Sequence, residues 1–360
     1  MKATLAEPIE LEAAERALLE AGRSETGAHR IATLNLLARA NDDEDAQRLS
    51  AELDTLLRSY PARVLVITPN LTPEPAWRAR LLHLGERESN GSVHAEILQL
   101  RGGRAEDAAA AAMPLLRGGL PVCLWWRGAT PIAAPGFEAL AHLAERVVYD
   151  SDELGKQAEA WRALSQQMRA QMRAQNNPCV TIDLVWPRLT RWRRLLAQTA
   201  DGPQGARLWA GLDRVRFQAC ASQPAMNAAA LMLTGWLSSR LGWKCLRRPA
   251  PERFLFRTTA DGELQLEFMT ENYGRPDTVL YGLQLENTRA GMSLHIGREG
   301  DRLKAELRRG GEVLGRIAGE FPRTDALAAL AQELQLCLPD QLYDEAQAAA
   351  LRLLELPVQA

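Results

Sequence analysis

The side chains that most often carry catalysis are scattered in this sequence. The histidines are His29, His83, His94, His142 and His295, and the cysteines are Cys123, Cys179, Cys220, Cys245 and Cys337. No two histidines have the spacing of metal ligands, and no two cysteines are close enough for a CxxC redox pair or a zinc knuckle. The motifs GxxxxGK[ST], GxGxxG, HExxH and GxSxG are also missing. We therefore expect no metal and no cofactor, and no catalytic constellation, although a single histidine could still act as a general base.

Two other groups have residue types that can bind ions. Gly102 and Gly103 lie between a predicted strand and a predicted helix, where backbone N–H groups can hold a phosphate. A tight strand-to-helix turn needs the same glycines without any ligand. The run DSDE at 150–153 has the composition of a metal or acid–base cluster, but Ser151 as a helix N-cap followed by acids explains it by helix electrostatics alone. We favour the structural explanation in both places and keep Gly102 and Gly103 as a possible anion site.

Tryptophans interleaved with arginines are the most distinctive feature, because these two types are enriched in the hot spots of protein interfaces. They occur as WWR at 125–127, after a predicted strand, and as WPRLTRWRR at 186–194. On a helix starting near residue 188, Arg191 and Arg194 share a face. The predicted partner-binding residues are Trp126, Arg127, Arg188, Arg191 and Arg194, with Trp125, Trp186 and Trp192 supporting them from the core. Ordinary core packing, with arginine stems lying over the rings, is an equally good explanation.

Length and composition limit the classes of protein that these residues can serve. The 360 residues suggest two domains. Lys+Arg 43 against Asp+Glu 45 gives a net charge of −2, so we expect neither nucleic acid nor an anionic membrane as a partner. The uncharged run from Phe217 to Ser239 contains too many polar residues for a membrane span and predicts a buried helix. With an acidic N-terminus and an odd number of cysteines, we expect a soluble, cytoplasmic protein.

Strand and helix signals alternate in the first half of the chain. Apolar, β-branched runs predict strands at 30–39, 63–68, 93–100, 121–126 and 146–149, with one more at 180–185. Amphipathic segments near 9–21, after Asn41, at 105–116, at 137–144 and after Ser151 predict the helices between them. This alternation is typical of a doubly wound, mostly parallel sheet covered on both faces. We expect a three-layer α/β domain over residues 1–185.

The pattern changes in the second half. Residues 188–243 read as helical, and from residue 253 apolar residues alternate with polar ones, with a hairpin signal at Asp261–Gly262. Such alternation predicts an antiparallel sheet with one solvated face. Helices are predicted after Thr324 and at about 339–354. We therefore expect an α+β domain over 186–360, with a helical segment, an antiparallel sheet and C-terminal helices.

Taken in order, several of these segments resemble the OpcA family of glucose-6-phosphate dehydrogenase assembly proteins. The resemblance is carried by YPARVLVITP, MPLLRGGLPVCLWWRG, LAERVVYDS, DLVWPRLTRWRRLLAQ and GWLSSRLG across about 60–243. It implies a non-catalytic partner that promotes assembly of that dehydrogenase and raises its activity at low glucose 6-phosphate. The competing hypothesis is an enzyme or sensor that binds a sugar phosphate or nucleotide at the strand ends near Gly102 and Trp126.

The cysteines mark one departure from that family. The resemblance implies that some members are controlled by thioredoxin through a closely placed pair of C-terminal cysteines. This chain has only Cys337 in that region. We therefore predict no dithiol control of that type.

Overall fold

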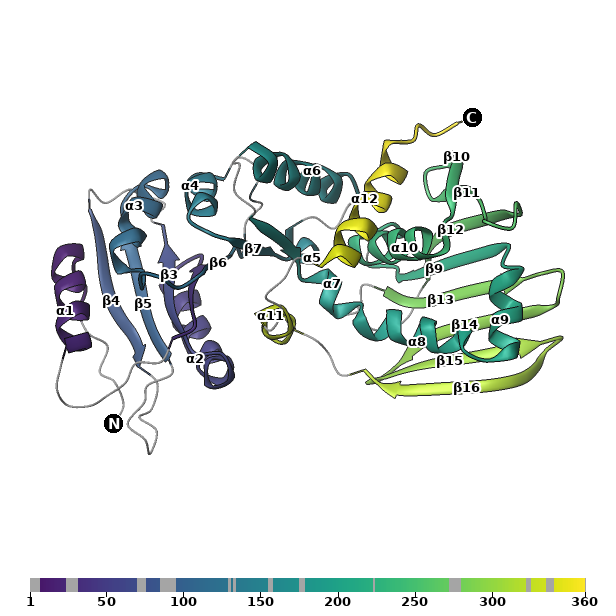
Figure 1. Ribbon diagram of the computed structural model, residues 1–360, viewed down its shortest axis with the longest axis horizontal. Helices are drawn as coiled ribbons and strands as arrows, with labels where there is room; N and C mark the ends of the chain where they lie inside the picture. The colour runs from purple at the N-terminus through teal and green to yellow at the C-terminus, as the bar shows by residue number, and fades with distance from the viewer. Residues whose placement is uncertain are drawn as a thin grey trace. The chain divides into compact units, whose positions relative to one another are not determined.

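The chain folds into two compact units, each with its own eight-stranded sheet (Figure 1). Unit 1 consists of Met1–Leu154, Gln166–Leu184 and Ala326–Cys337, and unit 2 of Gly155–Ser165, Val185–Asp325 and Leu338–Ala360. The structure is a computed structural model. It describes residues 7–23, 32–69, 76–84, 95–128, 131, 134–154, 158–174, 179–222, 224–271, 280–321, 325–334 and 340–359.

The sheet of unit 1 has the strand order β1-β4-β5-β3-β2-β6-β7-β8. Its strands are β1 (Ile9–Glu10), β2 (Leu34–Arg39), β3 (Ala62–Thr68), β4 (Trp77–Leu84), β5 (Ala95–Gly102), β6 (Val122–Trp125), β7 (Arg146–Tyr149) and β8 (Val180–Asp183). The six strands from β5 to β8 pair in parallel, whereas β4 is antiparallel to both β5 and β1. The predicted doubly wound, mostly parallel sheet is confirmed.

Helices cover this sheet and bury its central strands. They are α1 (Leu11–Arg23), α2 (Asp43–Ser59), α3 (Ala108–Ala112), α4 (Phe137–His142), α5 (Ser151–Leu154), α6 (Ala158–Ala174, shared between the units) and α11 (Ala326–Leu334). Leu49 and Leu53 of α2 join Val64 of β3 and Leu330 of α11 in one core cluster. A helix from the C-terminal part of the chain thus completes the core of unit 1.

The sheet of unit 2 has the order β10-β11-β12-β9-β13-β14-β15-β16. Its strands are β9 (Arg214–Cys220), β10 (Lys244–Ala250), β11 (Arg253–Arg257), β12 (Glu263–Glu271), β13 (Leu280–Asn287), β14 (Met292–Glu299), β15 (Arg302–Arg309) and β16 (Glu312–Glu320). Only the β9–β12 pair is parallel among the pairs of this sheet. The expected antiparallel character and the C-terminal helices are confirmed.

The helical prediction for residues 188–243 is wrong in one place. Residues 214–220 form β9, a central strand, because Val215 and Phe217 alternate inward while Arg214 and Arg216 lie over the other face. Both arginines form ion pairs with Glu286 on the neighbouring strand, at 3.2 and 3.1 Å. The uncharged run from Phe217 therefore divides between a strand and a helix. No helix in the described part of the chain is long and apolar enough to cross a membrane.

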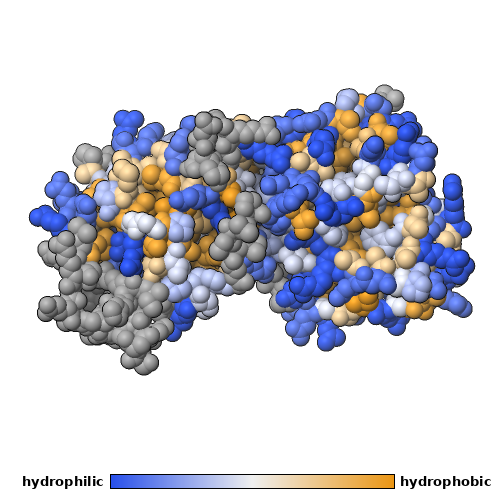
Figure 2. Space-filling view, viewed as in Figure 1, coloured by the Kyte–Doolittle hydropathy of each residue, from blue (hydrophilic) through white to orange (hydrophobic). Residues whose placement is uncertain are grey.

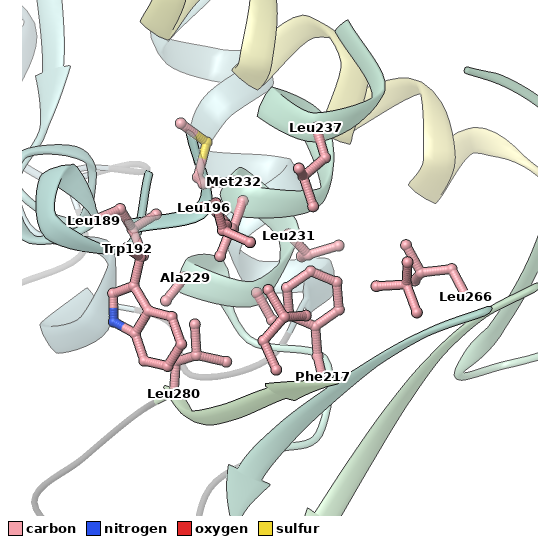
Figure 3. Close-up of a cluster of buried hydrophobic side chains, with 14 of the residues drawn as sticks. Leu189, Trp192, Leu196, Phe217, Ala229, Leu231, Met232, Leu237, Leu266 and Leu280 are labelled. Atoms are coloured by element: carbon pink, nitrogen blue, oxygen red, sulfur yellow. The ribbon is translucent and has the colours of Figure 1, made fainter. Parts of the chain in front are cut away.

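The helices of unit 2 pack on its sheet around a large apolar core. They are α7 (Val185–Arg188), α8 (Thr190–Ala200), α9 (Pro203–Ala210), α10 (Ala228–Leu241) and α12 (Gln341–Glu355). Trp192 of α8, Phe217 of β9 and Leu231 of α10 converge in this core (Figure 3). Helix α10 begins at Asn227, whose side chain accepts a 3.0 Å hydrogen bond from Ala230 N, and ends at Gly242 in the left-handed conformation.

Candidate functional site

The WWR segment at 125–127 lies at the end of β6, at the point where the strand order of the unit 1 sheet reverses. Strands β2 and β6 are parallel neighbours, and the chain continues from β2 to β3 on one side and from β6 to β7 on the other. The carboxyl ends of two such strands are where doubly wound sheets bind ligands. Arg39 ends β2, and Trp126 and Arg127 follow β6 directly.

Trp126 lies in the core, where we expected it on the surface. Its side chain is 3% exposed, and its ring packs edge-on against Phe137, with centroids 4.9 Å apart. Its backbone N donates to Val148 O at 2.9 Å, which holds the residue in line with the sheet. The prediction that the indole of Trp126 is exposed is therefore wrong, because the chain stays bonded to β7 just beyond β6 and the ring packs on Phe137 of α4. Trp125 is buried, as expected.

Arg39 and Arg127 form a charged cluster at these strand ends. Nη1 of Arg39 donates to Asn41 Oδ1 at 2.8 Å and to Arg127 O at 2.9 Å. The Arg127 guanidinium lies 4.9 Å from the Trp125 ring centroid and 3.5 Å from Asp45 Oδ1. Burial lowers the pKa of Arg39, Asp45 opposes that shift, and the charge of Arg127 adds to it. The cluster joins β2, β6 and the start of α2, with Asp45 supplying the negative charge.

The two ion-binding candidates of unit 1 have structural explanations. Gly102 and Gly103 have φ of 96° and 60°, and a Cβ on Gly103 would lie 2.1 Å from Nε1 of Trp77. Near Ser151, backbone N–H groups are capped by carboxylates: Asp183 Oδ1 accepts from Ser151 N at 3.2 Å, and Asp150 Oδ1 from Asp152 N at 3.2 Å. Within the described ranges, no group of three or more His, Cys, Asp or Glu side chains is placed to hold a metal ion. The anion site at Gly102 and Gly103 stays a prediction.

In unit 2, Trp186 connects the Trp/Arg segment to the C-terminal helix. Its side chain is 2% exposed, and Nε1 donates to Asp340 Oδ2 at 2.7 Å. Its ring packs edge-on against Tyr343 of α12, with centroids 5.8 Å apart. The guanidinium of Arg193 lies 3.4 Å from the centre of the Trp186 ring. These four residues, Trp186, Arg193, Asp340 and Tyr343, are termed the Trp186 cluster.

Arg193 is the member of this cluster that the sequence analysis did not single out. Its Nη2 donates to Thr190 Oγ1 at 3.0 Å and to Trp186 O at 3.5 Å, so it is fixed to the start of α8. Trp186 and Arg193 are seven positions apart, and two helical turns bring such residues to one face. That spacing was present in the sequence and could have identified the pair.

Asp340 joins the cluster to the start of α12. Its Oδ1 accepts from the backbone N of Leu342 at 2.9 Å and of Tyr343 at 3.2 Å, which makes it the N-cap, while Oδ2 accepts from Trp186. Further along, α12 packs on α10: a Cβ on Gly235 would lie 2.0 Å from Ala346 O. Arg240 of α10 pairs with Glu345. The segments DLVWPRLTRWRRLLAQ and GWLSSRLG therefore build the surface on which α12 lies.

The outer face of α8 carries two of the predicted partner-binding residues. Arg191 and Arg194 are exposed, and Arg188 is half-buried, whereas Trp192 packs inward and edge-on against Phe321 at 6.1 Å. Nη1 of Arg191 donates to Glu320 O, at the end of β16. The structure thus brings Arg188, Arg191 and Arg194 together in unit 2, and places Arg127 in unit 1. Binding of a partner by these arginines stays a prediction.

Three of the described cysteines, Cys123, Cys179 and Cys245, are unsuited to redox chemistry. Burial raises the pKa of the Cys123 thiol to about 12, and that of the Cys179 and Cys245 thiols to about 11. Their protonated state at neutral pH makes them poor nucleophiles. Cys337 lies outside the described residues, so the prediction about dithiol control is not tested.

Two family profiles match the chain over most of its length. The profile described as the glucose-6-phosphate dehydrogenase subunit N-terminal domain matches residues 53–166. The one described as the C-terminal domain of the same subunit matches residues 179–347, which include the Trp186 cluster. Both carry the family name OpcA.

Known proteins similar to this chain agree with the profiles. The "Putative OxPP cycle protein OpcA" of a Synechocystis species is 25% identical over 330 residues, which cover 84% of this chain and 66% of that protein. The protein of the same name from Nostoc punctiforme is 29% identical over 224 residues, 61% of this chain and 43% of that one. The chain thus spans about half to two thirds of the length of these relatives.

Similarity to solved structures is more distant. The aldose-aldose oxidoreductase of Caulobacter crescentus covers 90% of this chain and 96% of its own, at 10% identity and a TM-score of 0.44. At that score the likeness carries no functional argument. On the two profile matches and the named relatives, this chain belongs to the OpcA family.

Proposed function

We propose that this chain is a non-catalytic partner of glucose-6-phosphate dehydrogenase that acts in the cytoplasm as its assembly factor and allosteric activator. The observation that carries the proposal is the match of both domains, over 53–166 and 179–347, to profiles described as domains of a subunit of that dehydrogenase. The relatives named for the OxPP cycle support a role in the oxidative pentose phosphate pathway.

Activation by binding has a definite thermodynamic requirement. The chain must bind the active conformation or oligomer of the dehydrogenase more tightly than the inactive one, because equal affinity for both shifts no population. A tenfold preference corresponds to about 1.4 kcal/mol. Reciprocity then requires substrate, if it also favours the active form, to tighten the binding of the activator.

The arginines on the surface are the proposed contact residues. Arg191 and Arg194 are exposed on α8, Arg188 is half-buried next to them, and Arg127 is partly exposed in unit 1. Trp125, Trp186 and Trp192 support these arginines from the core, as does the buried Trp126, since all four fix the backbone that carries them. Arginine suits such a role because its planar guanidinium binds carboxylates through two hydrogen bonds.

The direct test is an assay of the cognate dehydrogenase at sub-saturating glucose 6-phosphate, with and without this chain. We expect a higher rate in its presence, and an earlier elution volume of the dehydrogenase in size-exclusion chromatography of the same mixture. An unchanged rate together with separate elution of the two proteins would refute the proposal. Turnover of a small molecule by this chain alone would also refute it.

A second candidate function is supported by one observation in unit 1. Nη1 of Arg127 is buried and makes no hydrogen bond within the described residues, although its ion pair with Asp45 Oδ1 is 3.5 Å long, and it lies at the strand ends where such sheets bind ligands. A sugar phosphate or nucleotide bound there would make the chain a sensor or an enzyme. A ligand at a hundred times its dissociation constant should stabilise the protein by about 2.7 kcal/mol. Thermal unfolding with sugar phosphates and nicotinamide nucleotides measures this, and unchanged melting temperatures would exclude the candidate.

A further inference from the structure

Strand β16 is the last strand of the unit 2 sheet, and no other described strand pairs with its outer edge. All nine of its residues are exposed, including Val313, Leu314 and Ile317, whose exposed fractions are 39%, 40% and 37%. The strand lies at the lower edge of that sheet in Figure 1, where Figure 2 shows apolar surface between hydrophilic residues. An edge strand has a row of backbone N–H and C=O groups that the sheet does not satisfy, and these can pair with another strand.

The opposite edge of the same sheet is protected. Strand β10 contains Pro249 and has two register shifts against β11. The C-terminal residues also cover it: Arg248 forms a β-bridge with Val358, and Gln359 N donates to Arg248 O at 2.9 Å. Proline, bulges and a covering segment are the usual means of preventing edge-to-edge pairing. On β16, the described residues show a single shift of register, opposite Leu307 and Arg308.

Charge on β16 indicates what could pair with it. Nε of Arg316, in the middle of the strand, donates to Oε2 of Glu306 at 2.6 Å, and Arg308 donates to the other oxygen of that carboxylate. These hydrogen bonds lower the pKa of Glu306. Glu312 and Glu320, at the two ends, form no ion pair with any other described residue, and their register neighbours on β15 are Arg309 and Arg302. The edge therefore presents an apolar centre between two exposed carboxylates.

A second copy of this chain fits this edge poorly. Antiparallel pairing of β16 with itself over its full length, centred on Arg316, would place Glu312 opposite Glu320 and Arg316 opposite Arg316. Like charges directly opposite each other destabilise a strand pair. A segment with apolar residues in its centre and Lys or Arg at both ends would instead complement the apolar residues and the carboxylates.

We propose that β16 is a docking edge to which an extended segment of the dehydrogenase, apolar in its centre and basic at its ends, adds as a further strand. This inference rests on the proposed function, which makes the dehydrogenase the partner. Backbone hydrogen bonds along β16 would supply affinity, and the pattern of side chains would supply specificity, as in other cases of strand addition. The edge is continuous with the proposed arginine surface, because Arg191 of α8 donates to Glu320 O.

The test measures the dissociation constant for the cognate dehydrogenase with substitutions on the edge. Ile317→Lys, placed in the apolar centre, should weaken binding at least tenfold. Glu312→Lys with Glu320→Lys should weaken it severalfold and reduce its dependence on salt concentration. Met113→Lys is the matched control, since Met113 is an apolar residue of unit 1 that is 59% exposed. Equal dissociation constants for Ile317→Lys and Met113→Lys would overturn the inference.

Hydrogen exchange on the unmodified proteins gives a measurement that does not depend on variant folding. Binding of the dehydrogenase should slow exchange of the amides of residues 312–320 at least tenfold. Unchanged exchange there in a formed complex would refute docking at β16 but leave the proposed function intact. A complex that never forms would refute the proposed function itself. A homodimer that forms through β16 without the dehydrogenase would show that a second copy is the occupant, and would also overturn the inference.

Discussion

Trp186 and Asp340 meet through one hydrogen bond although 154 positions separate them in the chain. The other oxygen of the Asp340 carboxylate caps α12, and the guanidinium of Arg193, on α8, lies over the Trp186 ring. Sequence analysis identified Trp186 as a distinctive residue but not its partner, since nothing local in the sequence marks a contact at that separation. Trp126 was predicted at the surface, whereas both Trp125 and Trp126 are buried, because a sheet covered on both faces has no solvated side at this strand end.

The Trp186 hydrogen bond can be tested by a substitution that keeps the ring apolar. Trp186→Phe removes the indole N–H and leaves the buried side of the Asp340 carboxylate without its donor, so we expect a loss of about 1.5–3 kcal/mol in the free energy of unfolding. Asp340→Asn is the control, because its amide oxygen can still accept from the indole or cap the helix, and it should cost less. Urea unfolding followed by circular dichroism measures both. Equal, small losses would contradict the role assigned to this bond.

The cysteines allow a prediction about pH. Because burial raises the pKa of Cys179 and Cys245 to about 11, only about one thiol in a thousand is ionised at pH 8. Labelling of the native protein by iodoacetamide should therefore be slow at pH 7–8 and accelerate about tenfold per pH unit up to pH 10, and Cys123, with a pKa of about 12, should react most slowly of these three. Mass spectrometry of timed samples measures the rates, with urea-unfolded protein as the control. Rapid labelling of Cys123 in the native protein at pH 7 would contradict the assignment.

At the scale of helices and strands, the predictable elements are those with a strong local pattern. Strands β3 and β6 are apolar runs bounded by proline or glycine, and their positions follow from the sequence. Strand β9 was predicted as helix because it follows α9 after only three residues, and its ion pairs with Glu286 are distant in the sequence. Strand β4 was not predicted, and it too carries a polar side chain that bonds across the sheet: Arg80 donates to Gln99 of β5 at 2.6 Å. A strand whose polar side chains bond to neighbouring strands lacks the apolar pattern by which strands are predicted.

The packing of α10 on α12 makes Gly235 a sensitive position. An alanine there would place its Cβ 2.0 Å from Ala346 O, so one helix must shift away from the other. We expect Gly235→Ala to destabilise unit 2 by about 1–3 kcal/mol, as overpacking typically does, although alanine is the better helix former. Ser239→Ala, on the same helix, is the matched control and should have little effect, because the one hydrogen bond of its hydroxyl to a described residue goes to Trp236 O, one turn back. Thermal unfolding distinguishes them, and a stabilised Gly235→Ala variant would contradict this packing.

On the scale of the whole molecule, the sequence indicated both sheet types and the family, but not how the chain divides between its units. Helix α11 belongs to unit 1, where Leu330 packs with residues of α2, while α12 belongs to unit 2. The signature segments of the family serve α12: they supply its cap partner, its aromatic contact and its close approach to α10. The buried residues of these segments therefore stabilise the fold, and the exposed arginines beside them are the ones that we propose bind the partner.

These exposed arginines give a prediction that separates binding from stability. In the double variant, Arg194→Glu should change the free energy of unfolding by no more than about 0.5 kcal/mol, since this side chain is exposed, and Arg191→Glu should cost about 1 kcal/mol more, since it also removes the hydrogen bond to Glu320 O. If they are hot spots, affinity for the dehydrogenase should fall by at least ~2 kcal/mol, roughly thirtyfold. Arg207→Glu, on the exposed face of α9, is the control. Isothermal titration calorimetry measures the affinities, and an unchanged value for the double variant would remove α8 from the contact surface.

The central claim is that this chain works by binding the active form of glucose-6-phosphate dehydrogenase. The most direct measurement is the dissociation constant of the complex of the two proteins, determined with and without saturating glucose 6-phosphate. The account predicts a complex that tightens when the substrate is present, because the activator and the substrate favour the same form of the enzyme. Failure of the two proteins to bind, or a dissociation constant that the substrate leaves unchanged, would contradict it.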